Sequence, residues 1–114
     1  MADGYFITPK DSDQVEMAAG VYRRTMATTD EAMVCEFFLE RETLIQEHSH
    51  LNDQVGYVVY GKVEVTIGGE MRVCHPGDSY AVPGGVNHSR RAVVDSLVVD
   101  IFSPPMNDYR TEAR

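Results

Sequence analysis

Hydrophobic residues recur at every second position along much of the chain, in short runs that glycine, proline and acidic residues interrupt. This period of two is typical of β-strands that bury one side and expose the other. The only stretch whose spacing suits a helical turn or two is residues 12–19. The pattern predicts strands over residues 5–8, 21–26, 33–40, 43–50, 54–60, 63–67, 71–73, 79–82 and 96–102.

Short turn sequences separate the predicted strands. They read "GK", "GGE", "HPGD" and "VPGGVN", and their Gly, Pro, Asn and Asp residues supply the backbone angles of a tight reversal. Many short strands without helices between them predict an all-β antiparallel sandwich or barrel. We expect a jelly roll that forms a single domain over residues 1–114, because closure of the sheets limits exposed strand edges.

Charge and cysteine content narrow the possible partners and the compartment. The chain has 18 Asp and Glu against 10 Lys and Arg, a formal net charge of −8, which disfavours nucleic acid and anionic membranes as partners. Cys35 and Cys74 lie in separate strand-like runs, and nothing resembles a disulfide framework, so we expect free thiols in a reducing cytoplasm. The N-terminal residues are charged where a signal peptide is apolar, and no apolar run reaches the length of a membrane span.

The segment "QEHSHLNDQVGYVVYG" carries the first candidate chemistry. His48 and His50 are two residues apart and therefore share one face of the predicted strand, and Gln54 begins the next strand. His88 follows a run of turn residues that could return the chain beside this pair. An isolated histidine pair of this kind is usually solvated surface, but three imidazoles and an amide oxygen form a plausible site for a divalent first-row metal.

Two longer motifs contain these residues. They read H-x-H-x(3)-Q-x(6)-G, from His48 to Gly61, and G-x(5)-P-x-G-x(2)-H, from Gly77 to His88. Together they resemble the two signature motifs of the cupin superfamily, with glutamine in place of the more frequent glutamate and without the asparagine that often follows the second motif. The resemblance implies a double-stranded β-helix (the jelly-roll cupin barrel), assembly as a homodimer, and a metal at His48, His50, Gln54 and His88.

The expected ligands also indicate what the metal would attract. Glutamine and neutral imidazoles carry no negative charge, so the ion keeps nearly all of its 2+ charge and favours anionic oxygen groups such as a carboxylate or an enolate. We therefore expect a small, anionic substrate. Nickel, zinc, iron and manganese all remain possible, because such a site follows the general affinity order of these metals.

The C-terminal run "SLVVDIFSPPMNDY" supplies two further candidates. Asp100 and Phe102 have the same strand parity as Val98, so a carboxylate and an aromatic ring could both point into the barrel. Asp100 is then a candidate general acid or base, and Phe102 a candidate active-site residue. The alternative is that Asp100 is satisfied by backbone donors at a strand end and that Phe102 is simply part of the core.

This tail, the histidine motif and the chain length resemble the pectin-degradation cupins of the KdgF type. Their tail pattern is Asp-x-Phe-(Thr/Ser)-Pro-x-Arg, and residues 100, 102, 103 and 104 match it, whereas Met106 stands where the arginine is expected. The resemblance implies an isomerase- or lyase-type enzyme that promotes ring opening of 4,5-unsaturated uronates. Methionine cannot hold a carboxylate as arginine does, and the substitutes that we consider are Arg90, Arg91 and Arg110.

Two other functions and one assembly remain open at this stage. A quercetinase-like cupin dioxygenase needs only three histidines and a carboxamide or carboxylate around iron, nickel or copper, and a non-catalytic cupin that binds a small molecule needs no proton-transfer group. We also expect a C2 homodimer, in which the predicted strand at residues 5–8 adds to the partner's sheet.

Overall fold

The fold is that of a computed structural model, which describes residues 5–110. Within this range it contains ten strands and two short 3-10 helices. None of the helices described could span a membrane. The elements are η1 (Pro9–Asp11), β1 (Gln14–Ala18), β2 (Val21–Thr28), β3 (Met33–Leu39), β4 (Leu44–His48), β5 (Asp53–Tyr60), β6 (Val63–Ile67), β7 (Glu70–Cys74), β8 (Ser79–Val82), β9 (His88–Ala92), β10 (Ser96–Ser103) and η2 (Asn107–Tyr109).

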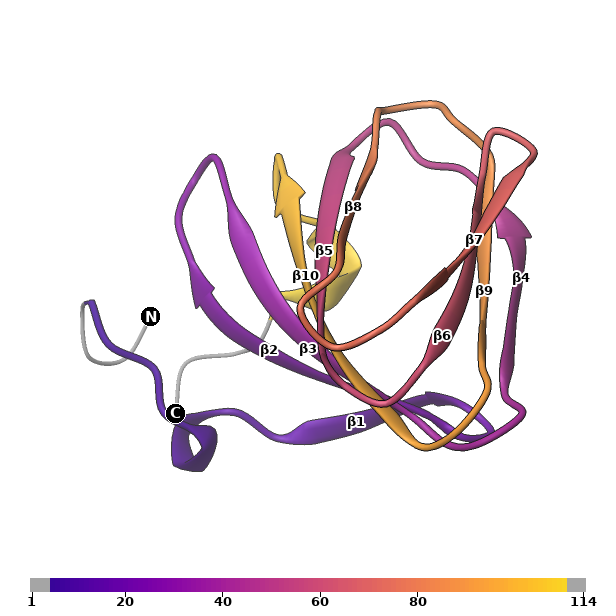
Figure 1. The fold of residues 1–114 in the computed structure, drawn as a ribbon. Coiled ribbons are helices and arrows are strands. Elements are labelled where there is room, and N and C mark those ends of the chain that lie inside the picture. The colour runs from indigo at the N-terminus through magenta and orange to yellow at the C-terminus, as the bar shows by residue number, and fades with distance from the viewer. Residues whose placement is uncertain (1–4, 111–114) are drawn as a thin grey trace.

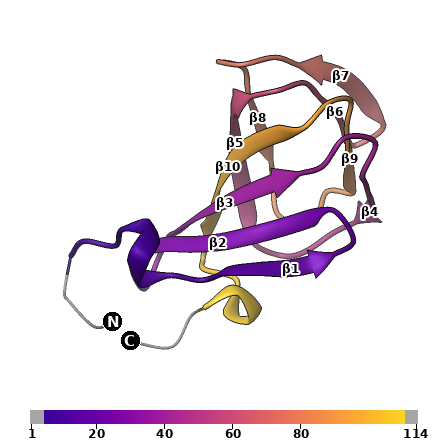
Figure 2. The same cartoon turned by 90° about the horizontal axis from the view of Figure 1, so that it is seen from below.

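The strands form two antiparallel sheets that face one another (Figures 1 and 2). The larger sheet has the strand order β1-β2-β3-β10-β5-β8, and the smaller has the order β4-β9-β6-β7. Strands that are distant in the sequence are therefore neighbours, as β10 is between β3 and β5. The predicted all-β jelly roll is confirmed.

Alternation along the strands directs one set of side chains into the space between the sheets. On β3, Met33, Cys35, Phe37 and Leu39 are buried while the intervening residues are half-buried. The same alternation on β10 buries Asp100 and Phe102 together with Ser96 and Val98. Both of the predicted C-terminal candidates thus lie in the interior, as their parity predicted.

Two of the predicted elements are wrong, and one strand was not predicted. Residues 5–8 form no strand, and residues 14–18 form the edge strand β1 where the sequence suggested a helical turn. Pairing with β2 decides this second case, since tertiary contacts outweigh the weak local preference of a short segment. Strand β9 was missed, because two of its inward residues, His88 and Arg90, are polar and hide the period of two.

Candidate metal centre

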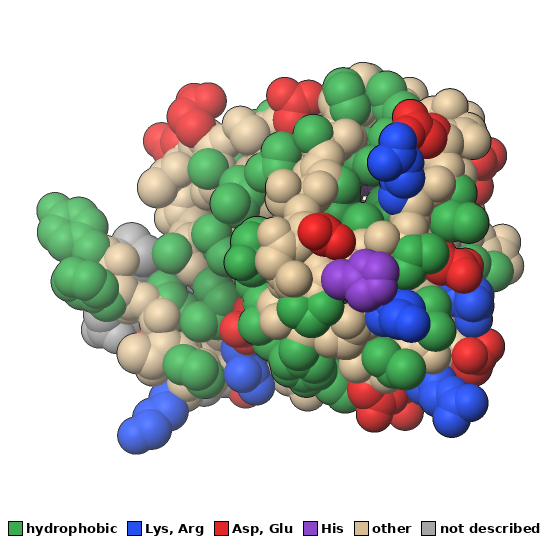
Figure 3. Space-filling model, in the orientation of Figure 1, with side chains coloured by type: hydrophobic (Ala, Val, Ile, Leu, Met, Phe, Trp, Pro, Cys, Tyr) green, Lys and Arg blue, Asp and Glu red, His purple; other side chains and the backbone are tan. Residues whose placement is uncertain are grey.

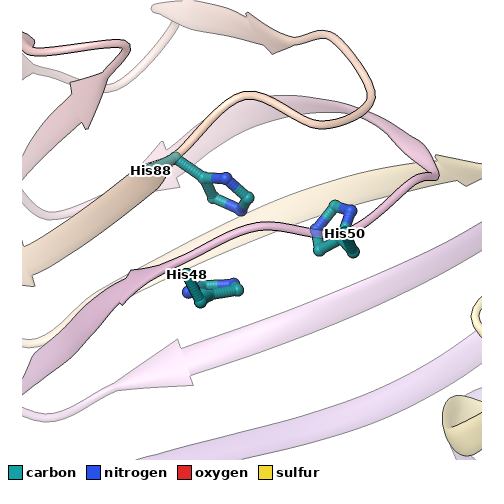
Figure 4. Close-up of side chains that lie close together, drawn as sticks. All are labelled: His48, His50 and His88. Carbon is teal, nitrogen blue, oxygen red and sulfur yellow. The ribbon is translucent and has the colours of Figure 1, made fainter.

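Three histidines converge at the edge of the smaller sheet. His48 ends β4 and His88 begins β9, and the two residues are cross-strand partners. His50 follows His48 in the loop that leads to β5. The ring centroids lie 4.3 Å apart for His48 and His88, 4.9 Å for His50 and His88, and 5.8 Å for His48 and His50. Figure 4 shows that the three rings gather in one region.

Hydrogen bonds to backbone carbonyls determine which ring nitrogen carries the proton in each of the three neutral histidines. Each Nδ1 lies 2.9 Å from the carbonyl oxygen of a residue two positions away. Because a carbonyl oxygen can only accept, each Nδ1 donates its proton and each Nε2 of a neutral ring keeps a free lone pair. One ligand atom from each ring lies within 4.8 Å of those of the other two. The carbonyls belong to Gln46, Asn52 and Val86.

Two features of the site indicate that a cation belongs there. The Nε2 of His88 is buried and has no hydrogen-bond partner among the described residues, a state that costs about 1–3 kcal/mol when it is left unsatisfied. The Oε1 of the buried Gln54 lies 3.0 Å from the Nε2 of His50, so two lone pairs face each other. A metal ion bound by both atoms removes this repulsion, and the donor set fits a divalent transition metal.

The surroundings of His88 favour the neutral form that binds metal. Burial lowers the pKa of His88, and the nearby His48, His50 and Arg90 lower it further, against a smaller opposite effect of the hydrogen bond to Val86. A proton is therefore a weak competitor for the Nε2 lone pair at neutral pH.

A cavity of about 400 Å³ opens beside the histidines, a size suited to a small molecule. One wall carries His48 and His88 on the smaller sheet, and the facing wall carries Met17 and Val21 on β1 and β2. None of the described residues that line the cavity is acidic. The cavity therefore suits an anion even though the whole chain carries a net charge of −8.

Asp100 is fully buried and belongs to a hydrogen-bonded triad. Its Oδ1 accepts a bond of 2.7 Å from the hydroxyl of Tyr80, and its Oδ2 accepts one of 2.8 Å from Nη1 of Arg90. Arg90 also donates to the Tyr80 oxygen at 2.7 Å. Burial lowers the pKa of Arg90, but Asp100 and Tyr80 raise it by more. Arg90 lines the cavity and Asp100 does not, so the carboxylate lies behind the guanidinium.

Glycine at position 56 makes room for this triad. Gly56 is the β5 partner of both Asp100 and Tyr80, and a Cβ at this position would collide with the Tyr80 ring and with the Asp100 carboxylate. The two interior side chains can therefore meet only across a residue without a side chain.

Phe102 lines the cavity and packs against His50. Its ring lies edge-on to those of His50, Phe37 and Tyr109, with centroids 6.0, 6.4 and 5.5 Å away. Such edge-to-face pairs hold neighbouring rings in a defined orientation. Phe102 is thus both a core residue and a wall of the cavity, which combines the two readings that its sequence position allowed.

The predicted substitutes for an arginine at position 106 differ in their positions. Met106 itself is half-buried against the core. Of the candidates, Arg90 lines the cavity but is paired with Asp100. Arg91 pairs with Glu42 and Glu64, and Arg110 is exposed.

Sequence reasoning missed three residues of this region. Tyr80 completes the triad, Tyr109 lines the cavity from the C-terminal η2, and Arg23 lies beside Tyr109. Arg23 has the inward parity of Val21 on a predicted strand, which was the one available signal. Tyr80 and Tyr109 gave no signal, because only the packing of distant segments brings them here.

The chain is similar in sequence and structure to several known proteins. A family model described as "Cupin domain" matches residues 35–102. The pectin degradation protein KdgF of Dickeya dadantii is 29% identical over 92% of this chain and 96% of its own length. The structure of KdgF from a Halomonas species is 34% identical, with a TM-score of 0.87 over 96% of this chain and 100% of that one. An RmlC-like cupin from Shewanella frigidimarina is 27% identical, with a TM-score of 0.88 over 92% and 95%.

Proposed function

Because the chain belongs to the cupin family, we propose that it is a metal-dependent enzyme that opens the ring of a small unsaturated uronate or a closely related sugar acid. The observation that carries this proposal is the convergence of three imidazoles and a glutamine oxygen beside a cavity without acidic residues. The similarity to two KdgF proteins, one of them named for pectin degradation, supports the choice of substrate class.

The chemistry of such a reaction sets the roles to be filled. Ring opening takes the proton from the hydroxyl at the anomeric carbon, breaks the bond from that carbon to the ring oxygen, and delivers a proton to the neighbouring double bond. The single linear product carries an aldehyde at one end and a ketone beside the carboxylate at the other. A divalent ion held by His48, His50, Gln54 and His88 supplies a Lewis acid for the negative charge that develops on oxygen.

The protein's own side chains supply charge and shape. Arg90 brings a guanidinium to the cavity wall, where it favours an anionic substrate. Phe102 and Tyr109 give the cavity flat apolar surfaces, on which the non-polar face of a sugar ring can rest. The scattered acidic and basic side chains of the face in Figure 3 form no basic stripe there that a nucleic acid would need.

Asp100 is the proposed proton-transfer group. Because its carboxylate lies behind Arg90, a direct transfer requires the Arg90 side chain to move, whereas an orienting role requires no movement. Arg90→Met separates the two roles. Activity that survives in Arg90→Met but falls in Asp100→Asn indicates direct transfer, and an equal loss in both indicates that Asp100 acts by holding Arg90.

One observation favours a second candidate, a cupin that binds a small molecule without converting it. In the described structure the carboxylate that would move a proton is fully buried and already paired, and it does not line the cavity. In that case galacturonate or a similar acid binds, and the double bond of an unsaturated uronate persists in the presence of the protein.

We also propose that two copies associate as a C2 homodimer. Val55 and Ile101 are cross-strand partners on the outer face of β5 and β10, and they are 45% and 40% exposed beside Tyr57 at 51%. A second copy of the same apolar face is its natural complement. Light scattering should give about twice the mass of one chain for the native protein and less for Tyr57→Glu; a native mass of one chain contradicts the proposal.

The function is tested with protein purified without a histidine tag. Elemental analysis should find close to one divalent metal ion per chain. Loss of the ultraviolet absorbance of the conjugated double bond then measures turnover of a 4,5-unsaturated uronate, with and without chelator. Met106→Arg tests the departure from the KdgF tail pattern, in which an arginine is expected at this position, and restoring the guanidinium should raise activity on this compound. No turnover by either protein at full metal occupancy would remove the enzymatic proposal.

A further inference from the structure

Besides Arg90, which pairs with Asp100, the protein buries a second arginine, and this one has no carboxylate partner among the described residues. Arg23 points inward from β2, only 6% exposed, beside Val15 of β1 and Phe37 of β3. Among residues 5–110 it makes no ion pair. A buried charge is costly to leave unpaired, so a protein rarely keeps one unless an anion comes to it.

The contacts of Arg23 hold its guanidinium in one orientation. Its Nε donates a hydrogen bond to Oγ1 of Thr25 at 3.1 Å, and this hydroxyl in turn donates one to the carbonyl oxygen of Tyr109 at 2.6 Å. Its Nη1 donates to Sδ of Met17 at 3.0 Å, and its Cζ lies 4.6 Å from the centroid of the Tyr109 ring. Two of the five N–H groups of the guanidinium are thus used, which leaves three without a partner among the described residues.

This guanidinium lies behind the wall of the metal-centre cavity: Arg23 itself does not line the cavity, but its contacts do. Met17 and Tyr109, the two side chains that it contacts, both line that cavity. They belong to β1 and to η2, whereas His48 and His88 belong to the facing sheet. A ligand held at one end by the metal reaches Arg23 with its other end only when the Met17 side chain moves aside.

We propose that Arg23 binds the carboxylate of the ligand, with Tyr109 and Met17 as the walls of this subsite. The Met17 thioether is a weak acceptor, and a carboxylate oxygen displaces it from Nη1 while the second oxygen accepts from Nη2. The side chain of Met17 is 38% exposed and flexible, so it can move aside. The naming of the ligand as a sugar acid rests on the proposed function, whereas the carboxylate preference rests on Arg23 alone.

Calorimetric titration of the metal-loaded protein with D-galacturonate and with D-galactose tests this subsite. Galacturonate carries the carboxylate, and galactose is its neutral counterpart. Arg23→Gln should weaken galacturonate binding by about 10–100-fold and leave galactose binding and metal content unchanged. Arg23→Lys, which keeps the charge but loses the planar fork, should be intermediate. Arg24→Gln is the matched control, because Arg24 is the next residue on β2 and pairs at 3.8 Å with Glu36.

Stability separates a binding role from a structural one. If Arg23 serves a ligand, Arg23→Gln should melt at the same temperature as the wild type or higher in the absence of ligand, since a buried charge has been removed. A lower melting temperature together with unchanged galacturonate affinity shows a structural residue and overturns the proposal. If Arg23→Gln does not fold, equal galacturonate affinity of Arg23→Lys and the wild type overturns it.

The same titrations distinguish failure of this subsite from failure of the proposed function. Galacturonate binding that depends on Arg23, combined with no turnover of an unsaturated uronate, leaves the subsite in place and removes the enzymatic proposal. Turnover with the same KM in the wild type and Arg23→Gln supports the enzymatic proposal and rejects the subsite. Equal affinity of the wild type for galacturonate and galactose also rejects the subsite.

Discussion

Removing the charges of Asp100 and Arg90, singly and together, gives the most quantitative test of the site. The pair is joined at 2.8 Å with side chains 0% and 9% exposed, so bulk water is a poor substitute for a lost partner. Removing one member of such a pair costs about 3–5 kcal/mol of unfolding free energy, because the other charge stays buried. We therefore expect losses of this size for Asp100→Asn and for Arg90→Met separately.

The double variant should lose no more than the larger of the two single losses, because neither charge then remains in the interior. The resulting coupling energy is then at least as large as the smaller single loss, about 3 kcal/mol or more. Urea unfolding in the presence of chelator gives the stabilities of the wild type, both single variants and the double variant, and the chelator removes any contribution of a metal at the neighbouring His88. Each single loss is a large share of the stability of a domain of this size, so the measurements need conditions in which both single variants still fold.

A matched control comes from the next residue of the same strand. Arg91 pairs at 2.8 Å with Glu42 and at 3.1 Å with Glu64, but these side chains are partly exposed. Arg91→Gln should lose far less than Arg90→Met, and salt should reduce the effect of Arg91 but not that of Arg90. A coupling energy below about 0.5 kcal/mol for the buried pair would refute the reasoning, since it would mean that the two charges do not depend on each other in the folded protein.

Three further expectations concern the ligands, the triad and the thiols. His48→Ala should abolish both metal content and turnover while the fold persists, and full metal occupancy in this variant would exclude His48 as a ligand. Gly56→Ala should destabilise by about 1–3 kcal/mol, because the added methyl collides with the Tyr80 ring; unchanged urea unfolding would contradict this close packing. Burial raises the pKa of Cys35 to about 11, so at pH 7 its thiol is protonated as well as inaccessible, and a disulfide reagent should modify it only as fast as the protein unfolds. Rapid modification of Cys35 in the folded protein would show that the β3 interior opens.

The side chains of the candidate metal centre could be predicted from the sequence because their placement is mostly local. His48 and His50 are two residues apart at the end of β4, which keeps their imidazoles near each other, and Gln54 follows within one short loop. Local carbonyls two residues away orient the three rings. Only the addition of His88 needs the tertiary structure, and here the resemblance to two known motifs replaced the missing long-range information.

The triad behind the cavity shows where such reasoning stops. Parity predicted that Asp100 points inward, but it could not identify Arg90 and Tyr80 as its partners. The partners come from β9 and β8, neither of which is adjacent to β10: Arg90 reaches Asp100 from the facing sheet, and Tyr80 reaches it over Gly56 of β5. The two earlier alternatives for Asp100, a free acid or base and a residue satisfied by backbone donors, both omitted this ion pair.

The sequence by itself determined the all-β class, the inward side of most strands and three of the side chains that gather at the candidate metal centre. It did so because a strand alternates its side chains with a fixed period, whatever its neighbours are. The tertiary structure alone decided which strands lie side by side, that residues 14–18 form an edge strand, and that Arg23 is buried without an ion-pair partner among the described residues. Those features depend on non-local pairing and on packing between two sheets, and the period of two within a strand carries no information about them.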